Sequence, residues 1–239
     1  MHIHNDYEIF YLLSGKVKYS VEGNIYTLNP GDIIVLRNNE SHHPIPKKST
    51  PYTRLFINFK PEDSLDDCLT DELLTIFTNR PAGLYNHYPT HQFPDNHWYF
   101  YLNSIYESSD NLKKQFLLMS LLLELKEYSS QLKKEPPTYS ASDIAQITQY
   151  IDKHLKQHLS LEMLCDRFFI SPTQLNRNFT RNLGTTVGEY ISTKRLLLAN
   201  DLIIQGQKPS YIFKQCGFND YSTFYRAYKK KFGHAPKET

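Results

Sequence analysis

The C-terminal half of the chain carries one sequence plan twice, as LSLEMLCDRFFISPTQLNRNFTRNLG (159–184) and as KPSYIFKQCGFNDYSTFYRAYKKKFG (208–233). In each copy a short apolar run and a tight turn precede a second run that opens with small hydroxyl or amide residues. The second run holds an arginine with an aromatic residue two positions later, and it ends in a glycine that suits a left-handed helix stop. This internal repeat predicts two helix–turn–helix units in tandem.

The second helix of each unit is the predicted DNA-reading element, because a recognition helix enters the major groove with its N-terminal turns against the base edges. Asn and Gln side chains can pair with adenine, Arg with guanine, and hydroxyl groups with either. The predicted base-reading residues are Thr173, Gln174, Asn176, Arg177, Ser222, Thr223 and Arg226. Basic residues further along each helix suit phosphate groups, which supply salt-dependent affinity without sequence information. They are Arg181, Lys229, Lys230 and Lys231.

The segment between the copies, TTVGEYISTKRLLLANDLIIQ (185–205), predicts one continuous helix with Val187, Ile191, Leu198 and Leu202 directed inward. At a rise of about 1.5 Å per residue such a helix is about 31 Å long, and one turn of DNA is about 34 Å. A rod of this length could hold the two predicted readers in successive major grooves. The alternative is a helical bundle or protein-interaction module whose basic residues form a solvated face. That alternative predicts no salt-dependent affinity for DNA.

Charge and composition divide the chain near residue 139. Residues 139–239 contain 14 Lys and Arg against 8 Asp and Glu, whereas acidic residues are in excess over residues 1–138. This asymmetry favours contact of the C-terminal half alone with a polyanion. The stretch KKEPPTYSAS (133–142) predicts a linker, since its two prolines cannot continue a helix. We therefore predict domains at 1–132 and 143–239, joined by this linker.

The N-terminal half changes its pattern after Pro61. Residues 7–59 alternate as short strands broken by Gly, Pro and Asn, with a turn predicted at Gly23-Asn24, and they predict a small antiparallel β-barrel or sandwich. Helical spacing follows, and residues 111–134 are apolar over more of the circumference than one packed face needs. That helix either packs on the barrel alone or also meets a second subunit. The predicted fold class is α+β, with an all-α C-terminal domain.

These motifs resemble the AraC/XylS-type transcription regulators. The double helix–turn–helix and the signature CGFNDYSTFYRAYKKKFGHAP (216–236) match the DNA-binding domain of that family, and residues 1–60 resemble its cupin-like effector barrel more loosely. The resemblance implies a homodimer that binds double-stranded promoter DNA, contacts RNA polymerase and senses a small molecule such as a sugar or related metabolite. The chain departs from the family pattern at Cys165, Phe169 and Phe213, where small residues are usual.

The opening HIHNDYEIFYLLSG also resembles the first cupin metal motif, through His2, His4, Glu8 and Gly15. In the second cupin motif a histidine follows a Gly-Asp turn, and His42 lies at that spacing. Three imidazoles and a carboxylate would suit Zn, Fe, Ni or Mn. We expect His4, Glu8 and His42 to line an effector pocket, with or without a divalent metal on these residues and His2. Two alternatives stay open, a purely structural role and a cupin-type metalloenzyme with an appended helical domain.

No other pattern indicates catalysis. The sequence contains no P-loop, GxGxxG or GxSxG motif, so we predict no catalytic residue, no enzyme activity and no required cofactor. Its first residues lack an apolar signal-peptide core, and its longest apolar stretch is shorter than the about 20 residues that span a bilayer. The three cysteines lie far apart and form no plausible disulfide framework. These features favour a cytoplasmic protein with no membrane partner.

Overall fold

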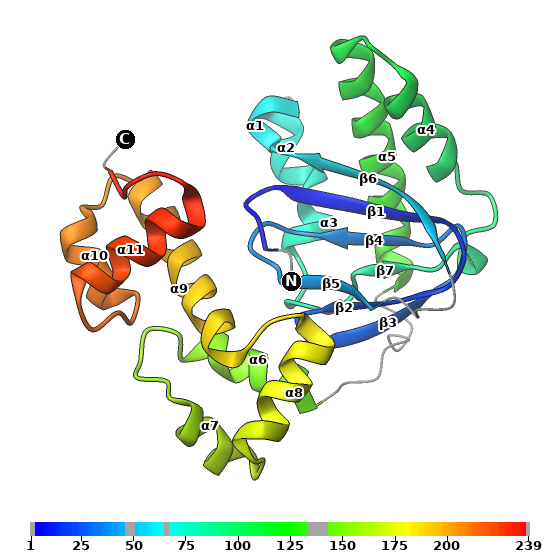
Figure 1. Cartoon of the computed structure of the whole chain (residues 1–239). Coiled ribbons are helices and arrows are strands. Elements are labelled where there is room, and N and C mark those ends of the chain that lie inside the picture. Colours follow the sequence, from blue (N-terminus) through cyan, green and yellow to red (C-terminus); the bar gives the residue numbers. More distant parts are fainter. Residues whose placement is uncertain (1–2, 46–50, 65–66, 133–142, 238–239) are drawn as a thin grey trace. The chain divides into compact units, whose positions relative to one another are not determined.

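A computed structural model describes residues 3–45, 51–64, 67–132 and 143–237 (Figure 1). The described residues divide into two compact units, an N-terminal one within residues 3–132 and a C-terminal one of residues 143–237. The predicted linker, 133–142, and the predicted metal ligand His2 lie outside the described residues. Within the described ranges, no helix is both long enough and apolar enough to cross a membrane.

The N-terminal unit contains two antiparallel sheets. The larger has the order β6-β1-β4-β7, formed by β1 (Tyr7–Ser14), β4 (Ile33–Leu36), β6 (Thr53–Phe59) and β7 (His87–Tyr88). The smaller has the order β3-β2-β5, formed by β2 (Val17–Val21), β3 (Asn24–Leu28) and β5 (His42–Ile45). The sequence predicted a barrel or a sandwich, and the described residues form two open sheets rather than a closed barrel. Strands β5 and β6 each lie at the edge of a sheet and are not paired with one another there.

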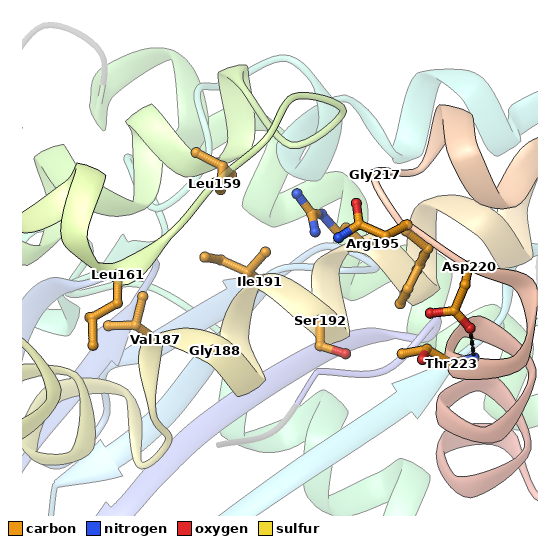
Figure 2. A pocket seen from close by; sticks show the side chains of 12 residues that line it. Leu159, Leu161, Val187, Gly188, Ile191, Ser192, Arg195, Gly217, Asp220 and Thr223 are labelled. Atoms are coloured by element: carbon orange, nitrogen blue, oxygen red, sulfur yellow. Dashed lines mark hydrogen bonds between the residues drawn. The ribbon is translucent and has the colours of Figure 1, made fainter.

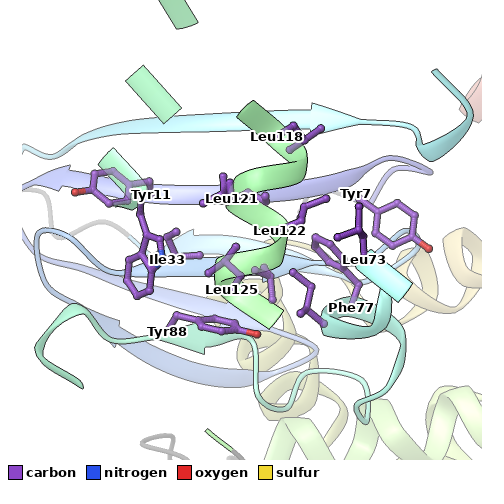
Figure 3. Close-up of a cluster of buried hydrophobic side chains, with 14 of the residues drawn as sticks. Tyr7, Tyr11, Ile33, Leu73, Phe77, Tyr88, Leu118, Leu121, Leu122 and Leu125 are labelled. Carbon is purple, nitrogen blue, oxygen red and sulfur yellow. The ribbon is translucent and has the colours of Figure 1, made fainter. Parts of the chain in front are cut away.

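Strand β1 is buried on both faces, which explains its near-continuous apolar sequence. Phe10 and Leu12 belong to a core that contains residues of both sheets. Tyr7, Ile9 and Tyr11 point to the opposite face, where helices cover the larger sheet. Figure 3 shows the leucines of the longest helix lying against these strand residues: Leu118, Leu121, Leu122 and Leu125.

Helices follow β6 in the N-terminal unit. They are α1 (Pro61–Ser64), α2 (Asp67–Leu73), α3 (Thr75–Thr78), the 3-10 turn η1 (Thr90–Gln92), α4 (Trp98–Glu107) and α5 (Asn111–Leu132). The predicted helical region is thus confirmed, although the short strand β7 within it was not predicted. The turn between β2 and β3 also differs by one residue, because the two positive backbone φ angles belong to Glu22 (47°) and Gly23 (82°). That pair matches the tight hairpin geometry in which both central residues are left-handed.

A buried ion pair connects the loop after α3 to the segment between β4 and β5. Arg80 donates to the Glu40 carboxylate twice, from Nη1 at 2.8 Å and from Nη2 at 2.7 Å. The backbone N–H of Gly83 donates to the same carboxylate at 2.7 Å. Burial alone would raise the pKa of Glu40, but the charge and hydrogen bonds of Arg80 outweigh it and hold that pKa at about 2. The sequence pattern gave no sign of this pair.

The C-terminal unit is entirely helical in its described part. It contains α6 (Asp143–Lys153), α7 (Leu161–Phe168), α8 (Pro172–Leu183), α9 (Val187–Ile204), α10 (Pro209–Gln215) and α11 (Tyr221–Phe232). Helix α9 is the predicted connecting helix, and its first half buries Val187 and Ile191 as expected. Its second half buries Leu196, Ala199 and Ile203, whereas Leu198 and Leu202 are only partly buried at the edge of the core.

Side-chain and glycine caps set the ends of the two predicted reading helices. The hydroxyl of Ser171 accepts from the backbone of Gln174 at the start of α8, and the carboxylate of Asp220 accepts from the backbone of Thr223 at the start of α11. Both helices end at a left-handed glycine, Gly184 and Gly233, so the predicted helix stops are confirmed.

Two hydrophobic cores form in this unit and share α9. The first contains residues of α6, α7, α8 and the first half of α9, and the second contains residues of α10, α11 and the second half of α9. Each core holds one buried cysteine, Cys165 in the first and Cys216 in the second. Phe213 is half-buried and packs edge-on against the ring of Tyr221 at 5.7 Å, which is how this unit accommodates a bulky residue there.

Candidate nucleic-acid interface and ligand pocket

Helix α8 presents a connected row of polar side chains. Thr173 and Arg177 are exposed, and Gln174 is half-buried between them. The Gln174 amide donates from Nε2 to the Asn178 side chain at 2.8 Å, while its oxygen accepts a hydrogen bond from Arg177. These bonds restrict the rotamers of Arg177 and Gln174 before any ligand arrives, which lowers the entropy cost of a later contact.

Asn176 lies differently from the other predicted base readers. Its side chain is half-buried, and its Oδ1 accepts a hydrogen bond from the backbone N–H of Val187 at 3.2 Å. Val187 is the first residue of α9, whose opening N–H groups have no partner within the helix. Asn176 therefore caps the connecting helix. Sequence reasoning missed this role because the partner lies eleven residues away in a different helix.

Helix α11 places Ser222, Thr223 and Arg226 on an exposed face. Its N-cap, Asp220, accepts from the Thr223 N–H at 2.7 Å, and hydrogen bonds from Thr223 lower the pKa of this carboxyl group. The carboxylate complements the positive end of the helix dipole. The opening turn of α11 is therefore well defined at the point where the predicted readers lie.

The predicted phosphate-binding residues lie near the C-terminal ends of the two helices and are exposed: Arg181, Lys229, Lys230 and Lys231. Desolvation lowers the pKa of Lys231, so that ammonium group is partly shielded from water. Cations in the last turn also stabilise a helix through its dipole. The exposure of Arg181, Lys229 and Lys230 also leaves their charged groups accessible to a polyanion.

In the N-terminal unit, His4, Glu8 and His42 come together. Nε2 of His4 lies 3.0 Å from Oε2 of Glu8, and Nε2 of His42 lies 3.4 Å from the same oxygen. The ligand atoms of the three residues all lie within 4.8 Å of one another. Burial alone would raise the pKa of Glu8, but hydrogen bonds from His4 and His42 outweigh it and hold that pKa at about 2. The same bond to Glu8 raises the pKa of His4.

The other ring nitrogens show what the three residues fit. Nδ1 of His4 lies 3.1 Å from the carbonyl oxygen of Asp6, and Nδ1 of His42 lies 3.0 Å from that of Glu40. Carbonyl oxygens only accept, so each Nδ1 carries a hydrogen. In a neutral ring, Nε2 would then point its lone pair at the Glu8 carboxylate. The lone pair and the negatively charged carboxylate repel each other, so a positive charge is needed between them. Either ring protons or a divalent metal ion would satisfy the arrangement, and backbone partners of this kind orient histidine ligands in metal sites.

The three residues lie at the side of a cavity of about 140 Å³. Its other lining residues are Phe10, Tyr19, Pro44, Arg54, Phe56 and Asn58. They come from β1, β2, β5 and β6, and β5 and β6 are the edge strands of their sheets. The guanidinium of Arg54 lies 5.4 Å from the ring centre of Phe56, within cation–π range. Sequence reasoning missed Tyr19, Arg54 and Asn58, although the strand alternation of β2 and β6 was the available signal.

Comparison with known protein families explains the two units together. Residues 1–75 match the family model for an AraC-like ligand binding domain, and residues 164–239 match that for a helix-turn-helix domain. The chain belongs to the AraC family of transcription regulators. AraC-family proteins combine an effector-binding domain with a helix–turn–helix DNA-binding domain. This chain is accordingly a transcription regulator with both kinds of domain. The resemblance seen in the sequence is confirmed.

Relatives within the AraC family are transcription regulators. The chain is 25% identical over 227 residues to the uncharacterized regulator YbfI of Bacillus subtilis, covering 92% of this chain and 79% of that protein. It is 23% identical over 248 residues to the transcriptional activator RhaS of Escherichia fergusonii, covering 99% and 86%. A match of 35% identity to the probable regulator LumQ of Photobacterium leiognathi spans 91 residues, which is 38% of this chain and 37% of LumQ.

Among solved structures, this AraC-family chain is similar to ToxT of Vibrio cholerae, whose structure was determined with an unsaturated fatty acid bound. The two share 16% identity over 99% of this chain and 87% of ToxT, with a TM-score of 0.42.

Proposed function

We propose that this AraC-family regulator reads DNA with α8 and α11, placed in successive major grooves, and that an effector in the N-terminal cavity alters this binding. The observation that supports the two readers is their equal register. Counted from the caps Ser171 and Asp220, an exposed hydroxyl stands at the second position, an arginine at the sixth and another basic residue at the tenth. Two helices with the same polar face fit two contacts of the same kind.

The proposed base readers are a subset of the residues predicted from the sequence. Arg177 and Arg226 carry most of the specificity, since bidentate arginine contacts to guanine discriminate strongly. The remaining readers are Thr173, Gln174, Ser222 and Thr223. Asn176 is left out, because its carboxamide caps α9. Arg181, Lys229, Lys230 and Lys231 contact phosphates in this proposal.

Duplexes selected from a random library by the parent protein provide the test. We expect Arg177→Ala and Arg226→Ala each to weaken binding to the selected duplex by about 1–3 kcal/mol, with a smaller loss on unselected DNA. The control is Lys230→Ala, which should weaken both duplexes alike and lower the slope of log affinity against log salt by about one. Arginine variants that bind the selected duplex as tightly as the parent would disprove this assignment.

The effector site is proposed at the cavity beside His4, Glu8 and His42. Its lining combines carboxylate, imidazole, guanidinium and amide groups with aromatic rings, and its volume of about 140 Å³ suits a small polar molecule. A sugar or related metabolite fits that description, since hydroxyl groups bond to the polar residues and ring faces stack on aromatic side chains. We further propose that the chain has no enzyme activity, and that it acts in the cytoplasm, where promoter DNA lies. Contact with RNA polymerase stays a prediction.

A divalent metal ion is a second candidate for this site, favoured by the way both Nε2 atoms and the Glu8 carboxylate converge. His4, Glu8 and His42 would hold the ion, which would supply open positions for oxygen atoms of an effector. Protein purified without chelators would be assayed for metal by elemental analysis, and then titrated with Co²⁺ while its visible absorption is followed.

If the ion binds there, Glu8→Gln and His42→Ala abolish both the stoichiometric metal and the cobalt spectrum, and Asn58→Ala leaves them unchanged. If the parent takes up no metal, the hydrogen bonds between the imidazoles and the ionised Glu8 carboxylate form the polar side of the effector cavity instead. A monosaccharide panel would then be screened by thermal shift against the parent and Glu8→Gln. A metal retained in both ligand variants would exclude the site.

A homodimer is the proposed assembly. Helix α5 buries one face in the unit, yet Leu112, Phe116 and Leu123 are 60%, 59% and 54% exposed. Their spacing of four and seven residues puts them on one stripe, the arrangement by which paired helices pack. We expect light scattering to give a dimer for the parent and a monomer for Phe116→Glu. Lys113→Glu, an exposed change outside the stripe, should stay dimeric. A dimeric Phe116→Glu would show that the dimer interface lies on another surface.

A further inference from the structure

Helix α9 passes through two cores, and the division between them falls within one turn of the helix. Ile191 is the last residue of α9 in the first core, and Leu196 is the first in the second core. The four residues between them, 192–195, are half-buried. A single helix joining two small cores leaves their relative orientation open to bending and twisting, unless a further contact restrains it.

Arg195 makes such a contact with the first helix–turn–helix unit. Its Nε donates to the carbonyl oxygen of Leu155 at 3.0 Å, and its Nη2 donates to that of Gln157 at 2.7 Å. Both acceptors lie in the segment between α6 and α7, and α7 packs in the first core. Two parallel bonds from one planar guanidinium fix its orientation as well as its position.

The same guanidinium lies against the second unit. A Cβ atom built on Gly217 would stand 2.6 Å from Nε, 2.7 Å from Cζ and 2.8 Å from Nη2 of Arg195. Gly217 forms the turn between α10 and α11 and has a φ of +83°. A Cβ atom here would force the guanidinium out of its place, and the left-handed backbone also favours glycine. Arg195 therefore touches the turn that sets the direction of α11 while it is bonded to the segment that precedes α7.

Around this contact the two helix–turn–helix units are not closely packed. A hollow of about 440 Å³ lies between them, lined by residues of α9, by Leu159 and Leu161 of the first unit, and by the turn and first residues of α11 in the second. Figure 2 shows Arg195 beside Gly217 in this hollow, with Leu159 from the first unit and Asp220 and Thr223 from the second around it. The guanidinium thus crosses a space that apolar side chains leave unfilled.

We propose that Arg195 is a positioning residue that sets the orientation of α11 relative to α8, and so the spacing of DNA half-sites that the protein accepts. The part about DNA rests on the proposed function of the two helices, whereas the orientation itself is a property of the free protein. Desolvation lowers the pKa of Arg195, as expected for a cation enclosed by backbone groups.

The first experiment measures orientation without DNA. Spin labels are attached to the full chain at Thr180→Cys on α8 and Gln215→Cys on α10, both exposed, with Cys68 replaced by Ser and the buried Cys165 and Cys216 left unlabelled. We expect one narrow distance distribution in the parent. Arg195→Ala should at least double its width, and Arg195→Lys should widen it as well, because an ammonium group cannot bond two carbonyls as a planar fork.

Lys194→Ala is the matched control. Lys194 carries the same charge one position earlier, but it pairs with Asp152 of α6, a helix of the first core, at 3.4 Å. Its removal should leave the distance distribution unchanged. A distribution for Arg195→Ala as narrow as that of the parent would overturn the proposal. Arg195→Lys serves as the deciding variant if Arg195→Ala fails to fold.

The second experiment varies DNA spacing. Duplexes carry the two selected half-sites at the optimal separation, or with one base pair added or removed, which rotates one half-site by about 34° given about 10.5 base pairs per turn. The parent should prefer the optimal duplex strongly. For Arg195→Ala we expect about tenfold weaker binding to it, a smaller penalty for the shifted duplexes and unchanged binding to a single half-site.

The two experiments separate the claims. An unchanged spacing preference in Arg195→Ala would overturn the proposal even if the labels moved, and weaker binding to the single half-site would point to a merely structural role. If the Arg177 and Arg226 variants also bind normally, the readers are wrong, yet the label distances still decide the role of Arg195.

Discussion

The two helix–turn–helix units share one sequence plan but differ in the left-handed residue of the turn between their helices. Each first helix is followed by a residue in the left-handed region: Phe169, directly after α7, with a φ of 53°, and Gly217, two residues after α10, with a φ of 83°. Phe169 extends its ring into solvent, 96% exposed, whereas Gly217 has the Arg195 guanidinium directly against it. The comparison teaches that the turn tolerates a strained side chain where it has space, and requires glycine where a neighbour fills the space.

A second difference lies on the inner face of the reading helices. Eight residues after its cap, α8 has Phe179 and α11 has Tyr228, and both rings are fully buried. The Tyr228 hydroxyl donates to the Asn200 side chain of α9 at 2.6 Å. The second unit is therefore tied to α9 by a polar bond that the first unit lacks at the equivalent position.

The strongest test of the comparison is Gly217→Ala. The left-handed backbone costs about 1–2 kcal/mol in a non-glycine residue, and the contact with Arg195 adds an overpacking cost of about 1–3 kcal/mol. We expect the opening free energy of α10 and α11, measured by hydrogen exchange, to fall by about 3 kcal/mol. Gly233→Ala has a similar φ of +80° with nothing within 4 Å of the added Cβ, so it shows the backbone cost alone. Equal losses at both glycines would show that the Arg195 contact is unimportant.

Tyr228→Phe converts the second unit to the chemistry of the first. It leaves the buried oxygen of Asn200 without its donor, which costs about 1–2 kcal/mol. Hydrogen exchange should detect this loss in α11 and in the second half of α9, and not in α8. Tyr221→Phe, at a 38% exposed side chain of the same helix, should change stability by less than about 0.5 kcal/mol. No difference between the two variants would refute a stabilising role for this bond.

Phe169→Gly makes the opposite exchange and has the smallest expected effect. It removes the left-handed strain of a bulky residue without removing buried surface, so the free energy of unfolding should rise by about 1 kcal/mol. Denaturant unfolding of the full chain would measure the gain, with Phe168→Gly as a control, since that half-buried residue packs against the first core. A loss of stability in Phe169→Gly would show that the exposed ring has a stabilising contact.

Local signals in the sequence were enough to predict the helical half. The caps and left-handed glycines depend on neighbouring residues, so Gly184 and Gly233 could be placed without knowing the fold. The resemblance to the cupin motifs placed His42 with His4 and Glu8, and the structure brings these three side chains together.

Contacts between distant side chains could not be predicted in the same way. Asn176 has a residue type that suits base reading, yet its partner is a backbone group at the start of another helix. Glu40 and Arg80 pair across forty residues, and Arg195 bonds to carbonyls forty and thirty-eight residues earlier. Nothing in a local pattern distinguishes these side chains from solvated ones. The two open sheets likewise depend on which strands pair at long range.

The buried cysteines Cys165 and Cys216 can report the local unfolding of the two C-terminal cores separately, because each core contains one of them. Burial raises the pKa of both thiols, that of Cys216 to about 11, so each is protonated and slow to react while its core is closed. Cys165 becomes reactive when the first core opens and Cys216 when the second does. The rates at which iodoacetamide labels the two peptides in one sample would therefore compare the local unfolding of the two halves under identical conditions.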